Sequence, residues 1–217
     1  MVQKSEDEEV KPAPRPRGRP RSFDAEATLA QATLTFWQRG YASTSLDDLS
    51  AATGLNRPSL YGAFGDKHAL YLQALRLYTE QSNAAIAKAF EGRSLRDGLL
   101  RVYDLALQLY CPADAPPRGC LLIGTAATEA PRDDAIRQAM SDALRGFTAA
   151  FEARLQRAVE EDELPLGTNV AMQAQLLSAV LHSMALRARA GDARADLAAL
   201  ARAGVDLVVS PPGTGAR

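Results

Sequence analysis

Residues 44–67 read TSLDDLSAATGLNRPSLYGAFGDK, and this stretch predicts two short helices joined by a tight turn. Ser45 and Asp48 have the spacing of a capping box, which starts the first helix. Gly54 supplies a turn residue that tolerates a positive φ. Pro58 stands in the first turn of the second helix, where a missing N–H costs nothing. Two short helices with such a turn predict a helix-turn-helix.

The second of these helices carries side chains suited to duplex DNA. Residues near the start of a recognition helix reach base edges in the major groove. Arg57 can donate two hydrogen bonds to a guanine. The hydroxyls of Thr44 and Tyr61 and the ammonium of Lys67 suit phosphate groups, whose contacts position a protein without specifying a sequence. The segment is therefore a candidate DNA-reading element.

The stretch from Phe23 to about Leu75 resembles the DNA-binding domain of the TetR/AcrR family of repressors. The matching pieces are Phe36–Gly40–Tyr41, Thr44–Ser45, Asp48–Leu49, the 51–55 turn, Ser59–Leu60–Tyr61, Phe64 and Lys67. The resemblance implies phosphate contacts from Thr44, Tyr61 and Lys67. The other candidate DNA-contacting residues of this segment are Ser45, Arg57, Pro58, Ser59 and Gly62. The resemblance also implies a homodimer and an all-α ligand domain. Asn56–Arg57–Pro58 departs from the usual family pattern, which affects the operator that is read.

The first 22 residues are rich in proline and charge and contain almost nothing apolar. We expect a disordered basic arm. Its three closely spaced arginines, Arg17, Arg19 and Arg21, resemble the core of an AT-hook, which lies in an A·T-rich minor groove. A solvated linker that only adds attraction for phosphates is the alternative.

The composition is that of an ordinary globular protein, with 47% hydrophobic residues among 217 and a net charge of −1. The beginning of the chain has no apolar stretch that resembles a signal peptide, and no apolar run is long enough to cross a membrane. Two cysteines and two histidines give no disulfide framework and no metal-ligand spacing. We expect a cytoplasmic protein without cofactor or metal.

Helical periodicity dominates the rest of the chain. We expect further helices over about 66–90, 94–110, 119–129, 133–161, 169–190 and 193–209. The predicted fold is all-α with about nine helices. The predicted domains are a three-helix DNA-binding domain over 23–68, a helical effector-binding and dimerisation domain over 69–209 and a flexible tail over 210–217.

A ligand pocket in the second domain is implied by the family resemblance. Candidate wall residues are Tyr103, Leu107, Tyr110, Phe147 and Phe151, although each would also suit a plain core. Their character favours a small lipophilic or aromatic effector. Dimerisation is expected through the last two helices, using Met172, Leu176, Ala179, Val180 and Ser183 on one and Leu197, Leu200, Gly204, Leu207 and Val208 on the other.

Cys120 is a candidate sensor within the ligand domain. Residues 118–122 resemble a subset of the family with a Gly-Cys-Leu segment, some members of which respond to electrophiles or oxidants. A helix N-terminus and Arg118 nearby would favour the thiolate of Cys120. The alternative is a small buried hydrophobic residue. Cys111 could act as a resolving partner.

These features predict a transcription repressor that a small lipophilic, aromatic or electrophilic effector releases from a palindromic operator. An effector would bias the helix that begins near Asp66 and so change the separation of two recognition helices. The alternatives are an activator, an architectural DNA-binding protein and an all-α thiol redox enzyme. The enzyme is disfavoured because no base-like histidine lies near Cys120 in the sequence and no phosphate-binding glycine loop is present.

Overall fold

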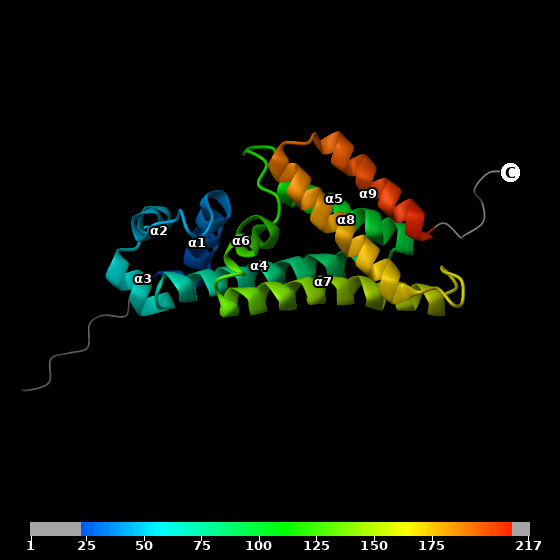
Figure 1. Ribbon diagram of the computed structural model, residues 1–217, viewed down its shortest axis with the longest axis horizontal. Coiled ribbons are helices and arrows are strands. Elements are labelled where there is room, and N and C mark those ends of the chain that lie inside the picture. Colours follow the sequence, from blue (N-terminus) through cyan, green and yellow to red (C-terminus); the bar gives the residue numbers. More distant parts are fainter. Residues whose placement is uncertain (1–22, 210–217) are drawn as a thin grey trace, which may run out of the picture.

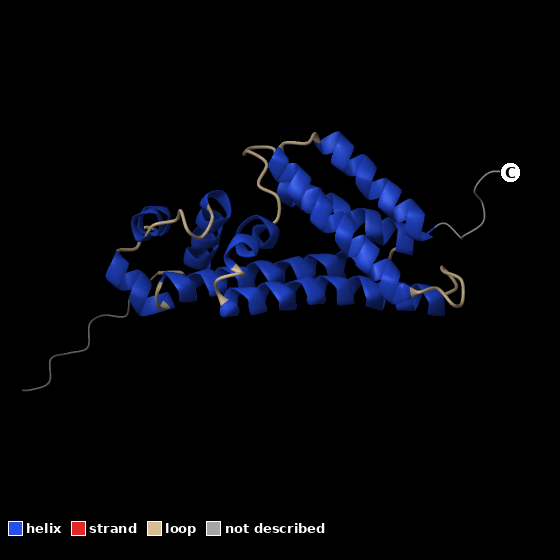
Figure 2. Cartoon of the chain, viewed as in Figure 1, coloured by secondary structure: helices blue, strands red, loops and turns tan. Residues whose placement is uncertain are grey.

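The computed structural model describes residues 23–209, and within that range every regular element is a helix (Figure 2). The elements are α1 (Ala25–Arg39), α2 (Leu46–Thr53), α3 (Arg57–Phe64), α4 (Lys67–Phe90), α5 (Leu95–Tyr110), a π-helical turn (Leu122–Ala126) that continues into α6 (Ala127–Glu129), α7 (Asp134–Glu160), α8 (Val170–Ala190) and α9 (Arg194–Val209). The prediction of an all-α fold is confirmed. The arm with Arg17, Arg19 and Arg21 and the 210–217 tail lie outside the described residues.

The helices of the first domain begin where capping side chains stand. The carboxylate of Asp24 accepts the backbone N–H groups of Glu26 and Ala27 at the start of α1. Ser45 and Asp48 form the predicted capping box of α2. Asn56 caps α3 by accepting the Ser59 N–H at 2.9 Å. Each such cap is worth about 1 kcal/mol, so the chain itself fixes these helix starts.

Two long helices, α4 and α7, run side by side along the molecule (Figure 1). The helices α1–α3 pack at the N-terminal end of α4, while α5, α8 and α9 gather at its other end. The buried apolar residues form one continuous core that extends from α1 to α9. Because α4 begins in the first predicted domain and ends in the second, it is a rigid connection between them.

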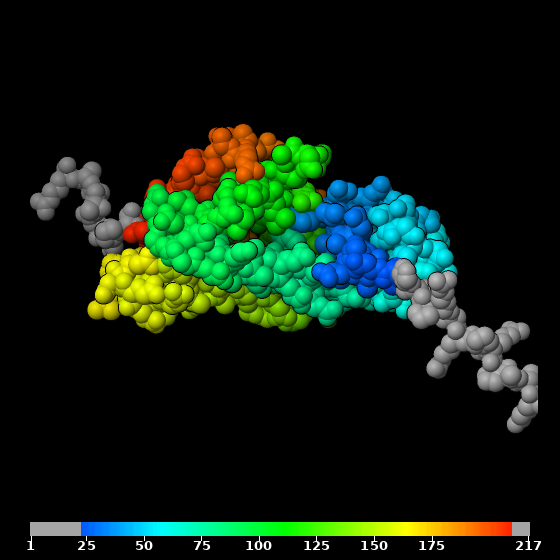
Figure 3. Space-filling view, turned by 180° about the vertical axis from the view of Figure 1, so that it is seen from behind, coloured from blue at the N-terminus to red at the C-terminus, as the bar shows by residue number. Residues whose placement is uncertain are grey.

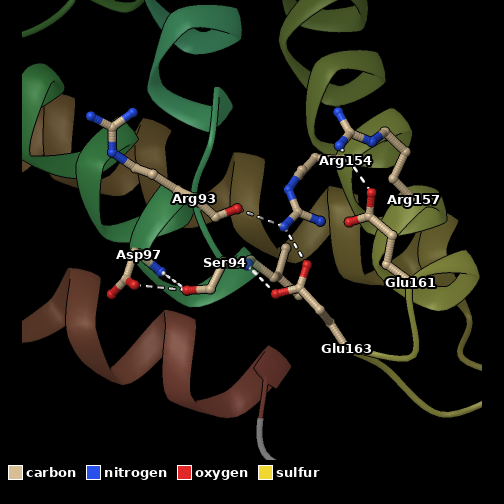
Figure 4. A network of polar contacts seen from close by, with 8 residues as sticks. Arg93, Ser94, Asp97, Arg154, Arg157, Glu161 and Glu163 are labelled. Atoms are coloured by element: carbon tan, nitrogen blue, oxygen red, sulfur yellow. Dashed lines mark hydrogen bonds and ion pairs between the residues drawn. The ribbon is translucent and has the colours of Figure 1, made fainter.

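An ion pair between Arg154 and Glu163 joins the ends of α4 and α7 that lie farthest from α1–α3 (Figure 4). Glu163, which follows α7, accepts hydrogen bonds from the backbone N–H of Leu95 and from the guanidinium of Arg154. Arg154 is only 3% exposed and also donates to the carbonyl of Arg93 at 3.3 Å. The network therefore ties the turn between α4 and α5 to the end of α7.

The last two helices expose most of the large apolar side chains that the described residues leave in solvent. Met172, Leu176 and Leu186 on α8 and Leu207 on α9 are exposed. Five of the ten residues expected at the dimer interface pack within their own protomer. Leu197 and Val208 are buried in the core, and Val180 and Leu200 are partly buried against it. Gly204 lies so close to Val180 that an added Cβ would come within 2.9 Å of that side chain. The expectation that Gly204 allows close approach between protomers is therefore corrected, because it allows close approach of α8 and α9 within one chain.

Candidate DNA-binding face and ligand cavity

Helix α3 presents an open face at one end of the elongated molecule, where Figure 3 shows the blue-to-cyan helices α1–α3. Arg57, Pro58, Tyr61 and Gly62 are all exposed there. Tyr61 keeps 46% of its surface in solvent, although most large aromatic side chains of the described residues are buried. Leu60 and Phe64 point the other way into the core. The face has the geometry required to enter a major groove.

Arg57 is held by an acidic residue of the preceding helix. Its Nε donates to Oδ1 of Asp47 at 3.0 Å, and its Nη2 donates to Oδ2 at 2.6 Å. This contact occupies one edge of the guanidinium. The edge formed by Nη1 and Nη2 stays free, and two donors on one edge match the acceptors of guanine. The arginine is thus oriented without losing its capacity to read a base.

Two predicted DNA contacts are corrected by their burial. Thr44 is 1% exposed, and its hydroxyl donates to the carbonyl of Gly40 at 2.6 Å. Ser59 is also buried, because it lies on the side of α3 that faces the core. Their side chains therefore stabilise the helix-turn-helix and are not presented to DNA. Ser45 remains exposed at the start of α2.

Lys67 lies at the first position of α4, with its ammonium 4.5 Å from the centre of the Tyr41 ring. Partial burial lowers the pKa of Lys67. The ring orients the side chain by a cation–π contact. Asp66 caps the helix by accepting the N–H of Ala69 at 2.8 Å.

The second domain contains an apolar cavity that lies beside a larger groove. The inner cavity, of about 60 Å³, is enclosed by α4, α5, α7 and α8 and is lined by residues such as Ile86, Val102 and Phe147. The outer groove, of about 550 Å³, lies between α1, α4 and α5. Tyr78, Ser82, Ala85, Leu105 and Leu109 line both volumes, so the two adjoin along α4 and α5. The groove has the size of a site for a small organic molecule.

The predicted wall residues divide between the cavity and the packed core. Tyr110 and Phe147 line the inner cavity. Tyr103, Leu107 and Phe151 do not line either volume, and all three are buried in the core. The hydroxyl of Tyr103 donates to the carbonyl of Leu177 at 2.9 Å, which fixes α5 against α8. The prediction of these three positions as wall residues is therefore wrong, because their side chains are packed into the core.

Cys120 lies behind the tyrosines of the cavity wall. It is 4% exposed, and its Sγ accepts a hydrogen bond from the Tyr78 hydroxyl at 3.1 Å. Burial raises the pKa of the Cys120 thiol, and the hydrogen bonds that it receives offset only part of that effect. The expectation of a favoured thiolate is therefore not met. The reason is burial of the thiol, and the guanidinium of Arg118 lies over the Trp37 ring, with its central carbon 4.2 Å from the ring centre.

Trp37 and Arg118 are the part of the site that sequence reasoning missed. Trp37, on α1, donates from its ring nitrogen to the carbonyl of Gly119 at 3.0 Å and packs edge-on against Tyr78 with ring centres 5.0 Å apart. Within the ligand domain, the hydroxyls of Tyr71 on α4 and Thr125 in the π-helical turn are hydrogen-bonded at 2.6 Å. The DNA-binding helices thus contact the ligand domain directly. The single tryptophan of the chain, on the inner side of an amphipathic helix, was the available signal.

A helix-turn-helix domain that shares a long helix with an all-helical domain containing an apolar cavity defines a DNA-binding regulator with its own sensing domain. Comparisons with known proteins identify the family. Residues 29–74 match the model of bacterial regulatory proteins of the tetR family, and residues 98–204 match the tetracyclin repressor-like C-terminal domain. The chain belongs to the tetR family of bacterial regulatory proteins.

Individual relatives agree with this assignment. The chain is 33% identical to the HTH-type transcriptional repressor ComR of Escherichia coli (strain K12), over 81% of this chain and 84% of that protein. It is 31% identical to the uncharacterized HTH-type transcriptional regulator YezE of Bacillus subtilis (strain 168), over 68% of this chain and 76% of that protein. The solved structure of a cysteine mutant of the TetR family regulator CifR, complexed with 26 bp double-strand operator DNA, is 30% identical, with a TM-score of 0.79 and coverage of 86% of this chain and 98% of that one.

Within residues 23–209, no helix combines the length and the apolar character needed to cross a membrane. The same residues gather no group of three or more His, Cys, Asp or Glu that could hold a metal ion.

Proposed function

We propose that this protein is a repressor that binds operator DNA as a homodimer and releases it when a small molecule occupies the cavity of the second domain. The observation that carries this proposal is the exposed face of α3, where Arg57 and Tyr61 stand clear of the core. Relatives named as transcriptional repressors support the direction of control. Such a protein acts in the cytoplasm on chromosomal DNA and has no catalytic step of its own.

The DNA contacts divide into base-reading and phosphate-binding residues. Arg57 reads a guanine through its free edge, while Pro58 and Gly62 bring the backbone of α3 close to the bases. Tyr61, Ser45 and Lys67 bind phosphates, which position α3 in the groove. The exposed positions of Ser45, Arg57, Pro58, Tyr61 and Gly62 support this division.

The dimer forms through α8 and α9, as the exposed apolar side chains Met172, Leu176 and Leu207 suggest. Ala179 is exposed on α8 and adds to this apolar face. Two symmetric recognition helices then contact half-sites about 34–36 Å apart, or a multiple of that distance. A ligand that shifts α4 changes this separation and so weakens binding at both half-sites together.

The proposal is tested by fluorescence anisotropy with a labelled duplex from the region upstream of the protein's own coding sequence. We expect saturable binding with two protomers per site, and weaker binding to a scrambled duplex of equal length. Raising the salt concentration should weaken both, because phosphate contacts release counterions. A monomer that ignores both duplexes at low salt would refute the proposal.

The thiol adds a narrower proposal. An electrophilic effector that enters the inner cavity meets Tyr78 before Cys120, since Tyr78 lines the cavity and its hydroxyl is hydrogen-bonded to the sulfur of Cys120 behind it. Reaction at Cys120 would therefore require Tyr78 to move, which would also disturb its ring contact with Trp37. Cys120 is a sensor only if such a movement opens it to solvent.

A further inference from the structure

Among the described residues, Arg118 is the one charged side chain that lines the groove or the adjoining inner cavity, and it lies on the groove wall. The other lining residues are apolar or neutral, including Gln81, Ser82 and Gln108. Arg118 belongs to the loop before the π-helical turn, and its guanidinium lies over the ring of Trp37 on α1. A single positive charge thus stands at one end of a largely apolar volume.

The guanidinium of Arg118 has unused donors. Its Nε donates to the carbonyl of Leu109 at 3.2 Å. Within residues 23–209, no carboxylate lies within 4.0 Å of it, and its Nη atoms have no hydrogen-bond partner. Partial burial lowers the pKa of Arg118, and the charges of Tyr78 and Asp114 offset only part of this effect. A planar arginine with two free terminal nitrogens is suited to a carboxylate, which accepts both bonds at once.

We propose that the groove binds an amphipathic monocarboxylate, with the carboxylate on Arg118 and an apolar or aromatic body extending between α4 and α5 toward Ile86 and Phe147. This inference rests on the proposed function, since it names the chemical class of the effector. A carboxylate carries the one negative charge that balances one arginine. A phosphate dianion would leave excess charge beside apolar walls, which is costly.

The position of Arg118 also explains how such a ligand would affect DNA binding. The next residue, Gly119, accepts the hydrogen bond from Trp37, and Arg118 itself covers the Trp37 ring. A carboxylate that draws the guanidinium toward the groove removes this cover and disturbs the contact between α1 and the ligand domain. The ligand thus acts on the DNA-binding domain at the point where it touches the sensing domain.

The chain provides its own probe, because Trp37 is its single tryptophan. The test is titration of the full-length protein, followed by tryptophan fluorescence and calorimetry, with hexanoate, decanoate, 4-phenylbutyrate and 1-naphthoate. Each is compared with the alcohol that has the same carbon skeleton. We expect at least one acid to bind about ten- to one-hundred-fold more tightly than its alcohol, with a change in Trp37 emission.

Variants connect that preference to one residue. Arg118→Gln should bind the acid and the alcohol equally, whereas Arg118→Lys, which keeps the charge but loses the planar fork, should retain a smaller preference. The control Arg76→Gln removes an exposed arginine from α4 outside the groove and should leave the preference unchanged. Circular dichroism confirms that each variant is folded.

Equal binding of acids and alcohols by the unaltered protein, no binding of any acid, or a preference that survives Arg118→Gln would each overturn the inference. These results leave the proposed function intact if the protein still binds its operator. If the unaltered protein shows no specific duplex binding, the proposed function is refuted, whatever the ligand titration gives. The two failures are therefore distinguishable.

Discussion

Arg57 and Asp47 form a two-pronged ion pair between α3 and α2, with N–O distances of 3.0 and 2.6 Å. The base-reading candidate is thus oriented by its own protein before DNA arrives. Both side chains are exposed, so the pair contributes little to folding stability. Its value lies in limiting the conformations of Arg57 at the DNA surface.

Removal of Arg57 should weaken operator binding and relax the sequence preference. Arg57→Ala loses a bidentate base contact, for which we expect a cost of about 1–3 kcal/mol on the operator. Fluorescence anisotropy with operator and scrambled duplexes measures the difference. An equal loss on both duplexes would assign Arg57 to phosphate binding instead.

Removal of the Asp47 charge should show whether Asp47 orients Arg57 for base reading, separately from its effect on the overall affinity for DNA. In Asp47→Asn, Arg57 is no longer held by a carboxylate, and one negative charge leaves the DNA-binding face. We expect the affinity for scrambled duplex to rise and the ratio of operator to scrambled affinity to fall. Asp142→Asn is the control, because it removes the same negative charge from α7, away from the DNA-binding face. An unchanged ratio for Asp47→Asn would show that Asp47 does not orient Arg57 on DNA.

The two cysteines should differ in their reactivity toward iodoacetamide. Cys120 is buried with a raised pKa, whereas Cys111 is partly exposed although its pKa is also raised by burial. Because only the thiolate reacts, labelling of the native protein should be slow at neutral pH, rise with pH and occur first at Cys111. Mass spectrometry of native and urea-unfolded protein measures both sites.

Fast labelling of Cys120 in the native protein would favour its role as a sensor. In that case Cys120→Ser should abolish release of DNA by electrophiles and leave operator binding unchanged. An electrophile response that survives this substitution would exclude Cys120.

Gly119 should tolerate no side chain. Its φ is +62°, and a Cβ would lie 2.3 Å from the carbonyl oxygen of Ala185. Gly119→Ala therefore combines backbone strain with a clash against α8, and we expect a loss of more than about 2 kcal/mol in the free energy of unfolding. Gly92→Ala is the matched control, since Gly92 has φ +63° and open space around it. Urea denaturation of both variants separates strain from clash, and equal losses would contradict the predicted clash.

The ion pair at the far end of the fold should make stability depend on pH. Partial burial acts to raise the pKa of Glu163, but the Leu95 N–H and Arg154 together hold that pKa below its ordinary value. A lowered pKa in the folded state means that the contribution is complete above the ordinary glutamate pKa of about 4.3 and is lost as the pH falls through the lowered pKa.

Glu163→Gln should accordingly destabilise the protein by roughly 1–3 kcal/mol near neutral pH, because Arg154 stays buried without its carboxylate. The difference from the unaltered protein should shrink in acid. Urea denaturation at a series of pH values measures this difference. A constant difference at all pH values would mean that the ionised carboxylate is not responsible.

The helices of the DNA-binding domain and the family are readable from the order of residues alone. Capping residues such as Ser45 and Asn56, and Gly54 with its φ of +69°, act within a few residues of the chain. Signals of that range are readable from order and spacing alone. The same holds for the long helices, whose boundaries follow from caps and periodicity.

Which side chains are available to DNA or ligand depends instead on how the helices pack. Ser59 lies beside exposed residues in the sequence yet is buried, because the rotation of α3 against its neighbours sets which residues face the core. Trp37 and Gly119 are 82 positions apart, and no local pattern predicts their hydrogen bond. The environment of Cys120 likewise depends on Tyr78 from another helix. Contacts between distant segments arise from packing of the whole chain, which local spacing does not encode.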